Sequence, residues 1–244
     1  MSMSDLSWLI ERPIAHRGYH DMNKTRWENT LSAFAAAADK GFAIECDVHL
    51  SNDGEVVVFH DNELRRLCGI DGYIWQKSAI EMAALRIGGT KDYAPRLVEL
   101  LDLVAGRVPL VIELKGIPGY DDGLVAKVAE LLKTYPGNAA IMSFDHWLIR
   151  QFPIHAPGIP AGLTAWGSRP QDWERHFSML GYDLSFVSYS ASELPNPFSE
   201  FIRHRLGMKL ITWTVREEPM VRHTFAHADQ MTFEGFNPDT AAVA

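Results

Sequence analysis

Short apolar runs of strand length alternate with segments of helical periodicity along most of the chain. The strand-like runs are rich in Val, Ile and Leu and end at Gly, Pro or polar turns, which is typical of buried strands. We expect strands at residues 13–18, 42–50, 55–60, 108–115, 139–144, 161–165, 184–189, 209–215 and 230–233. We expect helices at residues 31–38, 97–104 and 124–132, helices that begin at residue 145 and at about residue 171, and helices near residues 198–206 and 217–226. This alternation predicts an α/β protein.

Residues with special backbone preferences mark the ends of two of these helices. Gly41 lies where the residue after the helix at 31–38 is expected in a left-handed conformation. Asp121 or Asp122 is expected to cap the N-terminus of the helix at 124–132. Both signals support the helix bounds that the apolar spacing indicates.

Residues 51–54 form a short turn between two strands, and this spacing predicts a β-hairpin. If residues 55–60 are its return arm, eight strands remain with helices between them, which is the number in a (β/α)₈ or TIM barrel. We therefore expect one domain over residues 1–244, with residues 62–96 as a small insertion after the hairpin. A doubly wound open sheet is the alternative, although no Gly-rich phosphate fingerprint follows the first strand.

Polar side chains interrupt the apolar strands near their carboxyl ends, where a barrel collects its functional groups. Glu45 and Asp47 share one face of strand 42–50, because side chains alternate along a strand. Two adjacent carboxylates repel each other unless a cation lies between them, and Mg²⁺ and Ca²⁺ favour carboxylate oxygens. A solvent-facing sheet edge is the competing interpretation of this pair alone. Glu113, near the end of strand 108–115, offers a third carboxylate for one metal site.

The remaining polar residues at strand ends suit an anionic substrate and proton transfer. Arg17 and Lys115 match a phosphate-like group, Arg by its planar fork and Lys as a point charge. His16 and His60 supply two imidazoles that titrate near neutral pH, as needed when one group removes a proton and another donates one. Trp213 is expected either to stack on a ligand or to fill the barrel mouth. Together with the metal site, this set predicts cleavage of a phosphodiester.

Composition narrows the classes of partner. The net charge of −8 disfavours nucleic acid and anionic membranes. Two cysteines, Cys46 and Cys68, give no disulfide framework. The first eight residues have neither the basic start nor the apolar core of a signal peptide, and no apolar run reaches membrane-spanning length. We expect a cytoplasmic protein that acts on a small molecule and has no stable membrane insertion.

The motifs resemble those of the glycerophosphodiester phosphodiesterase family, whose site design is similar to that of phosphatidylinositol-specific phospholipases C. The resemblance runs from Ile14 to about Pro238. It rests on the segments His16-Arg17-Gly18, Glu28-Asn29-Thr30, Glu45-Cys46-Asp47-Val48, Asp53-Gly54, Val57-Val58-Phe59-His60-Asp61, Glu113-Leu114-Lys115, Ser143-Phe144 and Trp213-Thr214-Val215.

This resemblance implies a (β/α)₈ barrel with a small insertion and a role for each strand-end residue. The three carboxylates are expected to bind one divalent metal ion, Mg²⁺ or Ca²⁺, and the two histidines to form an acid/base pair. Arg17 and Lys115 are expected to contact the phosphate, and Trp213 the substrate. Three positions depart from the family pattern: Trp27 in place of Pro, Arg216 in place of Asn, and Thr232-Phe233-Glu234 in place of Thr-Asp. Because of these departures, the resemblance does not predict which alcohol the pocket accepts.

The leading function is metal-dependent hydrolysis of a glycerophosphodiester to glycerol 3-phosphate and an alcohol. A lipid-like diester, as in lysophospholipase-D-type relatives, requires an exposed apolar patch near the mouth, for which Tyr73, Ile74 and Trp75 are the candidates. A non-catalytic binding protein is disfavoured because the histidines and carboxylates are all present. A metallohydrolase of amides would typically carry a His-x-His pair on the first strand, where this chain has His16-Arg17.

Overall fold

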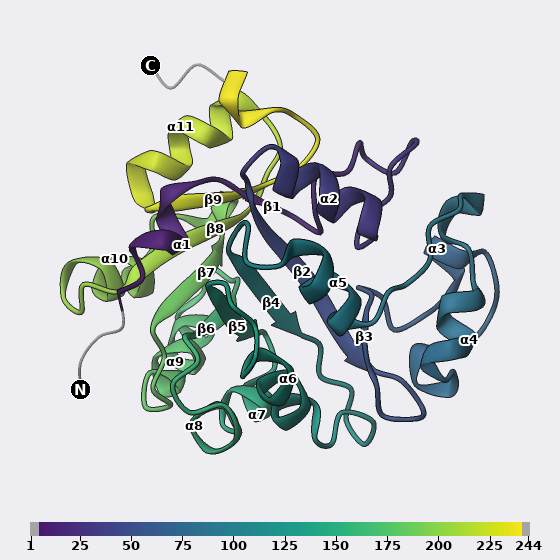
Figure 1. Cartoon of the computed structure of the whole chain (residues 1–244). Helices are drawn as coiled ribbons and strands as arrows, with labels where there is room; N and C mark the ends of the chain where they lie inside the picture. Colours follow the sequence, from purple (N-terminus) through teal and green to yellow (C-terminus); the bar gives the residue numbers. More distant parts are fainter. Residues whose placement is uncertain (1–4, 241–244) are drawn as a thin grey trace.

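Eight parallel strands close into a barrel in the computed structural model of the protein, which describes residues 5–240 (Figure 1). The ring runs β1-β2-β4-β5-β6-β7-β8-β9, and β9 pairs with β1 to complete it. The strands are β1 (Ile14–Ala15), β2 (Ala43–Leu50), β3 (Val56–Val58), β4 (Leu110–Leu114), β5 (Ala139–Ser143), β6 (Ala161–Ala165), β7 (Phe186–Ser190), β8 (Lys209–Val215) and β9 (Gln230–Phe233). Because β1 is paired on both sides, the open sheet is excluded and the expected (β/α)₈ barrel is confirmed.

The strand β3 lies outside the ring as the return arm of the expected hairpin. It pairs antiparallel with β2 and places Val58 opposite Val48. The backbone N–H of Phe59 then donates to the carbonyl of Asp47, so the chain leaves the hairpin beside the carboxyl end of β2. His60 consequently lines the same cavity as the carboxylates of β2, as the hairpin predicts.

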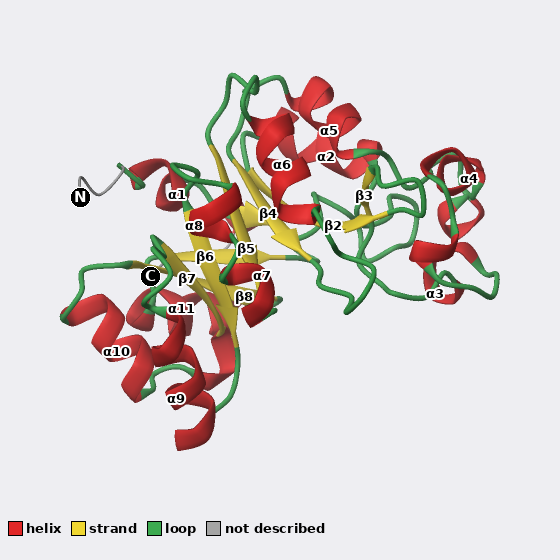
Figure 2. Cartoon of the chain, turned by 90° about the horizontal axis from the view of Figure 1, so that it is seen from below, coloured by secondary structure: helices red, strands yellow, loops and turns green. Residues whose placement is uncertain are grey.

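Helices cover the outside of the barrel and occupy the connections between strands (Figure 2). They are α1 (Ser7–Glu11), α2 (Leu31–Asp39), α3 (Arg65–Cys68), α4 (Ala79–Ala84), α5 (Leu97–Val104), α6 (Leu124–Leu132), α7 (His146–Ile149), α8 (Phe152–His155), α9 (Pro170–Met179), α10 (Pro197–His204) and α11 (Glu218–His227), with 3₁₀ turns η1 (Ile74–Gln76), η2 (Ile87–Gly89), η3 (Ala191–Glu193) and η4 (Pro238–Thr240). Most of the helices predicted from apolar spacing are therefore present within a few residues of their expected bounds.

The two predicted helix ends have different outcomes. Gly41 follows α2 with a φ of +68°, the left-handed conformation that the sequence predicts there. The expected aspartate cap of α6 is wrong, because the residue before that helix is Gly123, which has a positive φ and no capping side chain. The carboxylate of Asp121 instead accepts the backbone N–H of Ile117 and the indole N–H of Trp147, both at 2.8 Å.

The inward-facing residues of the barrel are apolar at the N-terminal ends of the strands and charged toward their carboxyl ends. Ala43 of β2 packs with Leu9 of α1 in a cluster that closes the N-terminal end of the barrel. Glu45 and Asp47 follow on the same face of β2, because alternate residues of a strand point the same way. They are only 2% and 1% exposed, and β2 has a neighbour on each side. The interpretation of a solvent-facing sheet edge is therefore wrong.

Residues 62–96 form the expected insertion beside the barrel. Its elements α3 and α4 lie next to each other on the outer side of β3 in Figures 1 and 2. They pack around an apolar cluster of their own that includes Leu64 and Met82 and reaches the hairpin through Phe59. Ile74, expected in an exposed patch, belongs to this cluster and is fully buried, so that expectation is wrong for Ile74. The insertion is thus a small packed unit anchored on the hairpin.

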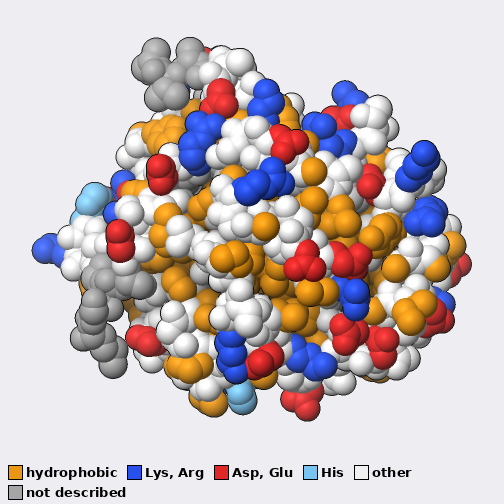
Figure 3. Space-filling view, viewed as in Figure 1, with side chains coloured by type: hydrophobic (Ala, Val, Ile, Leu, Met, Phe, Trp, Pro, Cys, Tyr) orange, Lys and Arg blue, Asp and Glu red, His pale blue; other side chains and the backbone are white. Residues whose placement is uncertain are grey.

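Within residues 5–240, none of the helices has both the length and the apolar character needed to span a membrane. On the face seen in Figure 3, acidic and basic side chains are interspersed over the surface. The described part of the chain excludes residues 1–4 and 241–244. Half of the eight residues on which the signal-peptide prediction rests therefore lie outside it. The cytoplasmic location stays a prediction.

Candidate active site

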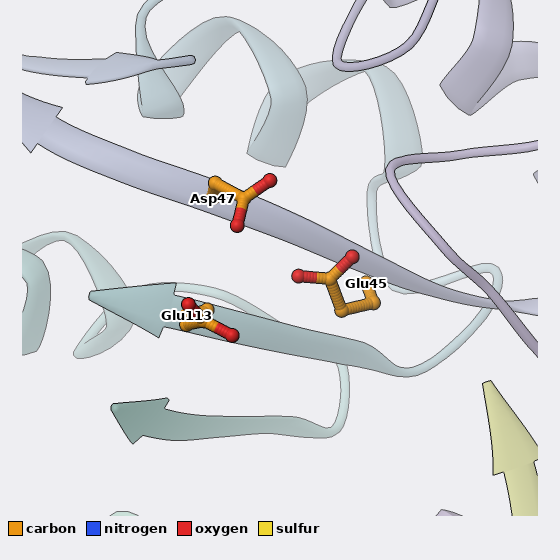
Figure 4. A group of neighbouring side chains, drawn as sticks. All are labelled: Glu45, Asp47 and Glu113. Atoms are coloured by element: carbon orange, nitrogen blue, oxygen red, sulfur yellow. The ribbon is translucent and has the colours of Figure 1, made fainter. Parts of the chain in front are cut away.

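Three buried carboxylates lie together at the carboxyl ends of β2 and β4. Asp47 stands opposite Glu113 in the parallel register of these strands, and Glu45 precedes Asp47 on the same face. One oxygen of each carboxylate lies within 4.8 Å of the other two. Figure 4 shows Asp47 over β2 and Glu113 over the neighbouring β4, with the carboxylate of Glu45 on the side that faces the other two. The three predicted metal ligands are therefore brought together in space.

Neighbouring cations compensate only part of the charge on these carboxylates. The Nζ atom of Lys115 is 2.9 Å from Oδ1 of Asp47 and also contacts Glu113. The backbone N–H of Arg17 donates to Glu45 at 2.8 Å. Burial raises the pKa of Glu45, and the charges of Asp47 and Glu113 raise it further. A divalent cation among these oxygens would remove that cost, so the donor set fits such an ion.

His16 directly follows β1 and is bonded to a carboxylate that directly follows β9. Its Nδ1 is 2.5 Å from Oε2 of Glu234, and its Nε2 is 3.9 Å from Glu45. Arg216 donates its Nε–H to the other oxygen of Glu234 at 2.7 Å. Burial lowers the pKa of His16, and the hydrogen bond to Glu234 opposes this effect. Arg216 and Glu234 both depart from the family pattern, and they form an ion pair with each other.

His60 is held by a network of charged side chains that reaches into the insertion. Its Nδ1 is 2.7 Å from Oδ1 of Asp61. Arg66 of α3 donates to both oxygens of Asp61, at 2.6 and 2.8 Å, and to both oxygens of Glu28, each at 2.8 Å. Glu28 in turn accepts from Nη1 of Arg17 at 2.6 Å. One arginine of the insertion therefore connects a site histidine with the phosphate-binding cation predicted from the sequence.

A cavity of about 130 Å³ opens among these groups at the carboxyl ends of the strands, where barrel enzymes carry their sites. Its lining includes all eight predicted site residues: His16, Arg17, Glu45, Asp47, His60, Glu113, Lys115 and Trp213. Ser188 and Thr232 also line it. Their hydroxyls and the indole N–H of Trp213 are buried and have no hydrogen-bonding partner within residues 5–240. Because buried polar atoms without partners are costly, these groups are suited to bond a ligand.

The sequence profile of the Glycerophosphoryl diester phosphodiesterase family matches residues 16–240. The chain belongs to this family. A glycerophosphodiester phosphodiesterase from Caldanaerobacter subterraneus subsp. tengcongensis is 32% identical over 231 residues, which cover 88% of this chain and 90% of that protein. A lysophospholipase D from Rattus norvegicus is 30% identical over 139 residues, which cover 52% of this chain and 42% of that protein. The protein is therefore a phosphoric diester hydrolase of the glycerophosphodiester phosphodiesterase type.

Solved structures share the barrel fold of this chain. An Oleispira antarctica phosphodiesterase in complex with the product sn-glycerol-3-phosphate superposes with a TM-score of 0.80 at 23% identity, over 93% of this chain and 94% of that one. A putative glycerophosphoryl diester phosphodiesterase from Silicibacter pomeroyi also has a TM-score of 0.80, at 25% identity, over 93% of this chain and 90% of that one. Both likenesses support the barrel fold.

Sequence reasoning assigned no role to the charged residues that hold the two histidines. Asp61 directly follows His60, and Glu234 directly follows the last strand, so their positions at strand ends carried a usable signal. Arg66 lies in the insertion, where no local pattern connects it with the site. The third departure from the family pattern, Trp27, packs against the insertion, because a Cβ at Gly88 would lie 1.9 Å from its ring.

Proposed function

We propose that this enzyme hydrolyses a glycerophosphodiester to glycerol 3-phosphate and an alcohol, with His16 and His60 as its acid/base pair. The observation that carries the proposal is the single cavity lined by both histidines, three carboxylates and two cations. Hydrolysis requires that the nucleophile be deprotonated and the leaving alkoxide be protonated. General acid or base catalysis of each kind contributes roughly 10²–10⁴-fold. We propose further that residues 1–244 act as one catalytic domain.

Glu45, Asp47 and Glu113 would hold one divalent cation, Mg²⁺ or Ca²⁺. When bound, this ion supplies positive charge that stabilises the phosphoryl oxygens in the transition state. Arg17 and Lys115 would bind the phosphoryl oxygens from the protein side, Arg17 through its fork and Lys115 through its ammonium group. The support for the ion is chemical, because three buried carboxylates with only partial compensation favour a hard cation.

The two histidines are assigned to opposite sides of the phosphate, since one follows β1 and the other follows the hairpin arm. Each has a carboxylate within hydrogen-bonding distance of its Nδ1, Glu234 for His16 and Asp61 for His60. This arrangement leaves Nε2 of each ring to exchange a proton with the substrate. The carboxylates orient the rings and stabilise the imidazolium form during turnover.

The glycerol part is assigned to the part of the cavity that Ser188, Thr232 and Trp213 line. Ser188, Thr232 and Trp213 offer two hydroxyls and one N–H without partners, which match the hydrogen-bonding groups of glycerol. The complex of the Oleispira antarctica phosphodiesterase with sn-glycerol-3-phosphate supports a product of this kind in a barrel of the same fold.

A lipid-like diester is the second candidate, because one exposed aromatic stack favours it. The rings of Tyr73 and Trp75 lie 4.6 Å apart, and those of Trp75 and Tyr120 lie 5.0 Å apart. Tyr73 and Tyr120 are 39% and 53% exposed. The partial match to a lysophospholipase D supports the same substrate class.

The test is release of glycerol 3-phosphate by metal-depleted enzyme resupplied with Mg²⁺ or Ca²⁺. We expect release from water-soluble glycerophosphodiesters, and a loss of roughly 10²-fold or more in kcat/KM for His16→Ala and for His60→Ala. The variant that lacks the general acid should lose much less on a p-nitrophenyl diester, because p-nitrophenolate departs unprotonated. Equal losses for both variants on both substrates would contradict the division of roles. Turnover of lysophosphatidylcholine alone would favour the lipid candidate.

A further inference from the structure

A groove of about 560 Å³ lies next to the catalytic cavity, between α7 and the segment from β6 to α9. Phe144 lines both spaces. Its ring meets Trp213 edge-on at 5.2 Å and lies 5.7 Å from Nζ of Lys115. The catalytic cavity, at about 130 Å³, is smaller than the roughly 300–1,000 Å³ of ordinary ligand sites. Part of a diester therefore extends beyond it, and the groove is the adjoining space.

Two exposed tryptophans form walls of this groove. Trp147 is 41% exposed and Trp166 is 63% exposed. The indole N–H of Trp147 donates to Asp121 at 2.8 Å, which fixes the orientation of the ring. Gly116 permits this position beside Lys115, because a Cβ there would lie 2.5 Å from the Trp147 ring. The ring of Trp147, on the side of the groove nearer to Lys115, is thus an aromatic surface with a fixed orientation, which is a recurrent feature of binding sites.

The groove also contains buried polar atoms without partners. Thr164 and His176 line it and are 2% and 7% exposed. Nε2 of His176 lies 3.0 Å from the backbone carbonyl of Trp166, whereas its Nδ1 has no partner within residues 5–240. The hydroxyl of Thr164 likewise has none in that range. Both atoms are suited to bond the hydroxyl groups of a ligand, which can donate and accept.

The charges of the groove select against a cationic ligand. Arg169 is paired with Asp172, its Nε lying 3.0 Å from Oδ2. Arg175 makes no ion pair within residues 5–240, and the side chains that line the groove include two arginines and one aspartate. A quaternary ammonium group would gain from the tryptophan faces but would be repelled by Arg175. Hydroxyl oxygens, in contrast, accept hydrogen bonds from a guanidinium group.

We propose that this groove binds the alcohol part of the diester, and that the alcohol is an uncharged, hydroxyl-rich compound. Its carbon face stacks on Trp147 and Trp166, and its hydroxyls bond Thr164 and His176. This inference rests on the proposed phosphodiesterase function and names the substrate class of the same site.

The experiment compares three diesters of glycerol 3-phosphate whose alcohols are methanol, inositol and choline. The methyl diester reports on the catalytic cavity alone, because its alcohol is too small to fill the groove. For the wild type we expect the highest kcat/KM with the inositol diester. Trp166→Ala should raise KM for that diester about tenfold, through the loss of an aromatic contact and its buried area. Thr164→Val should raise it about three- to tenfold, as expected for one lost hydrogen bond.

Both variants should leave KM for the methyl diester unchanged. Phe225→Ala is the matched control, since it removes an aromatic ring of α11 that is 38% exposed and lies outside the groove, and it should alter no KM. An equal rise in KM for the methyl and inositol diesters would overturn the proposal, as would a wild-type preference for the choline diester that Trp166→Ala abolishes. No glycerol 3-phosphate from even the methyl diester would instead refute the phosphodiesterase function itself, so the two failures are distinguishable.

Discussion

The two proposed catalytic histidines are positioned by carboxylates that lie outside the set of expected metal ligands. His16 depends on Glu234 at the end of β9, and His60 depends on Asp61. Asp61 is itself held by Arg66, which also binds Glu28. A histidine that is fixed in one orientation spends more of its time in the geometry that the reaction needs. Small displacements of catalytic groups lower the reaction rate strongly. We therefore expect residues without substrate contact to contribute to the rate at this site.

Arg66 gives a direct test of this positioning. Arg66→Met should lower kcat about 10- to 100-fold with a smaller rise in KM, because Asp61, the partner of His60, loses its arginine, whereas Glu28 keeps its bond to Arg17. Arg66→Lys should also be impaired, since one ammonium group cannot replace a fork that bonds two carboxylates. Arg65→Met is the matched control on the same helix, because within residues 5–240 the ion-pair partner of Arg65 is Asp71 of the insertion alone. Equal effects of the two methionine variants would refute the role of Arg66.

Glu28 connects the same network to acid stability. Burial raises its pKa, but the hydrogen bond from Arg66 and the charge of Arg17 outweigh burial and lower it to about 2. The folded pKa lies below the unfolded value, so the stabilisation is fully present above about pH 4.5 and is lost as pH falls toward 2. Its magnitude near neutral pH is on the order of 3 kcal/mol.

Urea unfolding of the wild type and Glu28→Gln at pH 6 and pH 3 measures this effect. The difference in unfolding free energy should be large at pH 6 and clearly smaller at pH 3. Glu130→Gln, which changes an exposed carboxylate paired with Lys133, should show a small difference at both values. A difference for Glu28→Gln that does not depend on pH would contradict the assignment.

At the scale of elements, apolar strands were predictable from the sequence and polar connections were not. The pattern of Val56, Val57 and Val58 after a turn was enough to predict the hairpin, because buried strands leave continuous apolar runs. The short helix α1 and the small helix α3 left no periodic signal of useful length. The cap of α6 was predicted wrongly, since Asp121 bonds a loop and an indole rather than the helix N-terminus.

The insertion should affect both stability and catalysis, because α3 carries Arg66 and packs on the hairpin. Leu64→Ala, at a fully buried position of the insertion cluster, should lower the unfolding free energy by about 2–5 kcal/mol. It should also lower kcat when the activity is measured at a temperature at which the variant is still folded. Leu206→Ala, at a position that is 42% exposed, is the control and should change neither quantity. Unaltered kcat in a destabilised Leu64→Ala variant would show that the insertion does not support the site.

At the scale of the whole molecule, barrel closure brings together residues that are far apart in sequence. His16 and Glu234 meet because β1 pairs with β9, and Asp47 meets Glu113 because β2 pairs with β4 in register. The eight residues that the sequence predicts for the site, from their places at strand ends, all line one cavity. The sequence did not predict the groove, because the contacts of Trp147 with Asp121 and Gly116 depend on how separate loops pack.

The most direct test of the account is a metal titration of activity with the wild type and Glu45→Gln, following glycerol 3-phosphate release. The account predicts that the metal-depleted wild type is inactive and regains activity with added Mg²⁺ or Ca²⁺. It predicts that Glu45→Gln, although folded, stays strongly impaired at every metal concentration at which the wild type is saturated. Full activity of Glu45→Gln at limiting metal, or undiminished activity of the metal-depleted wild type, would contradict the proposed site.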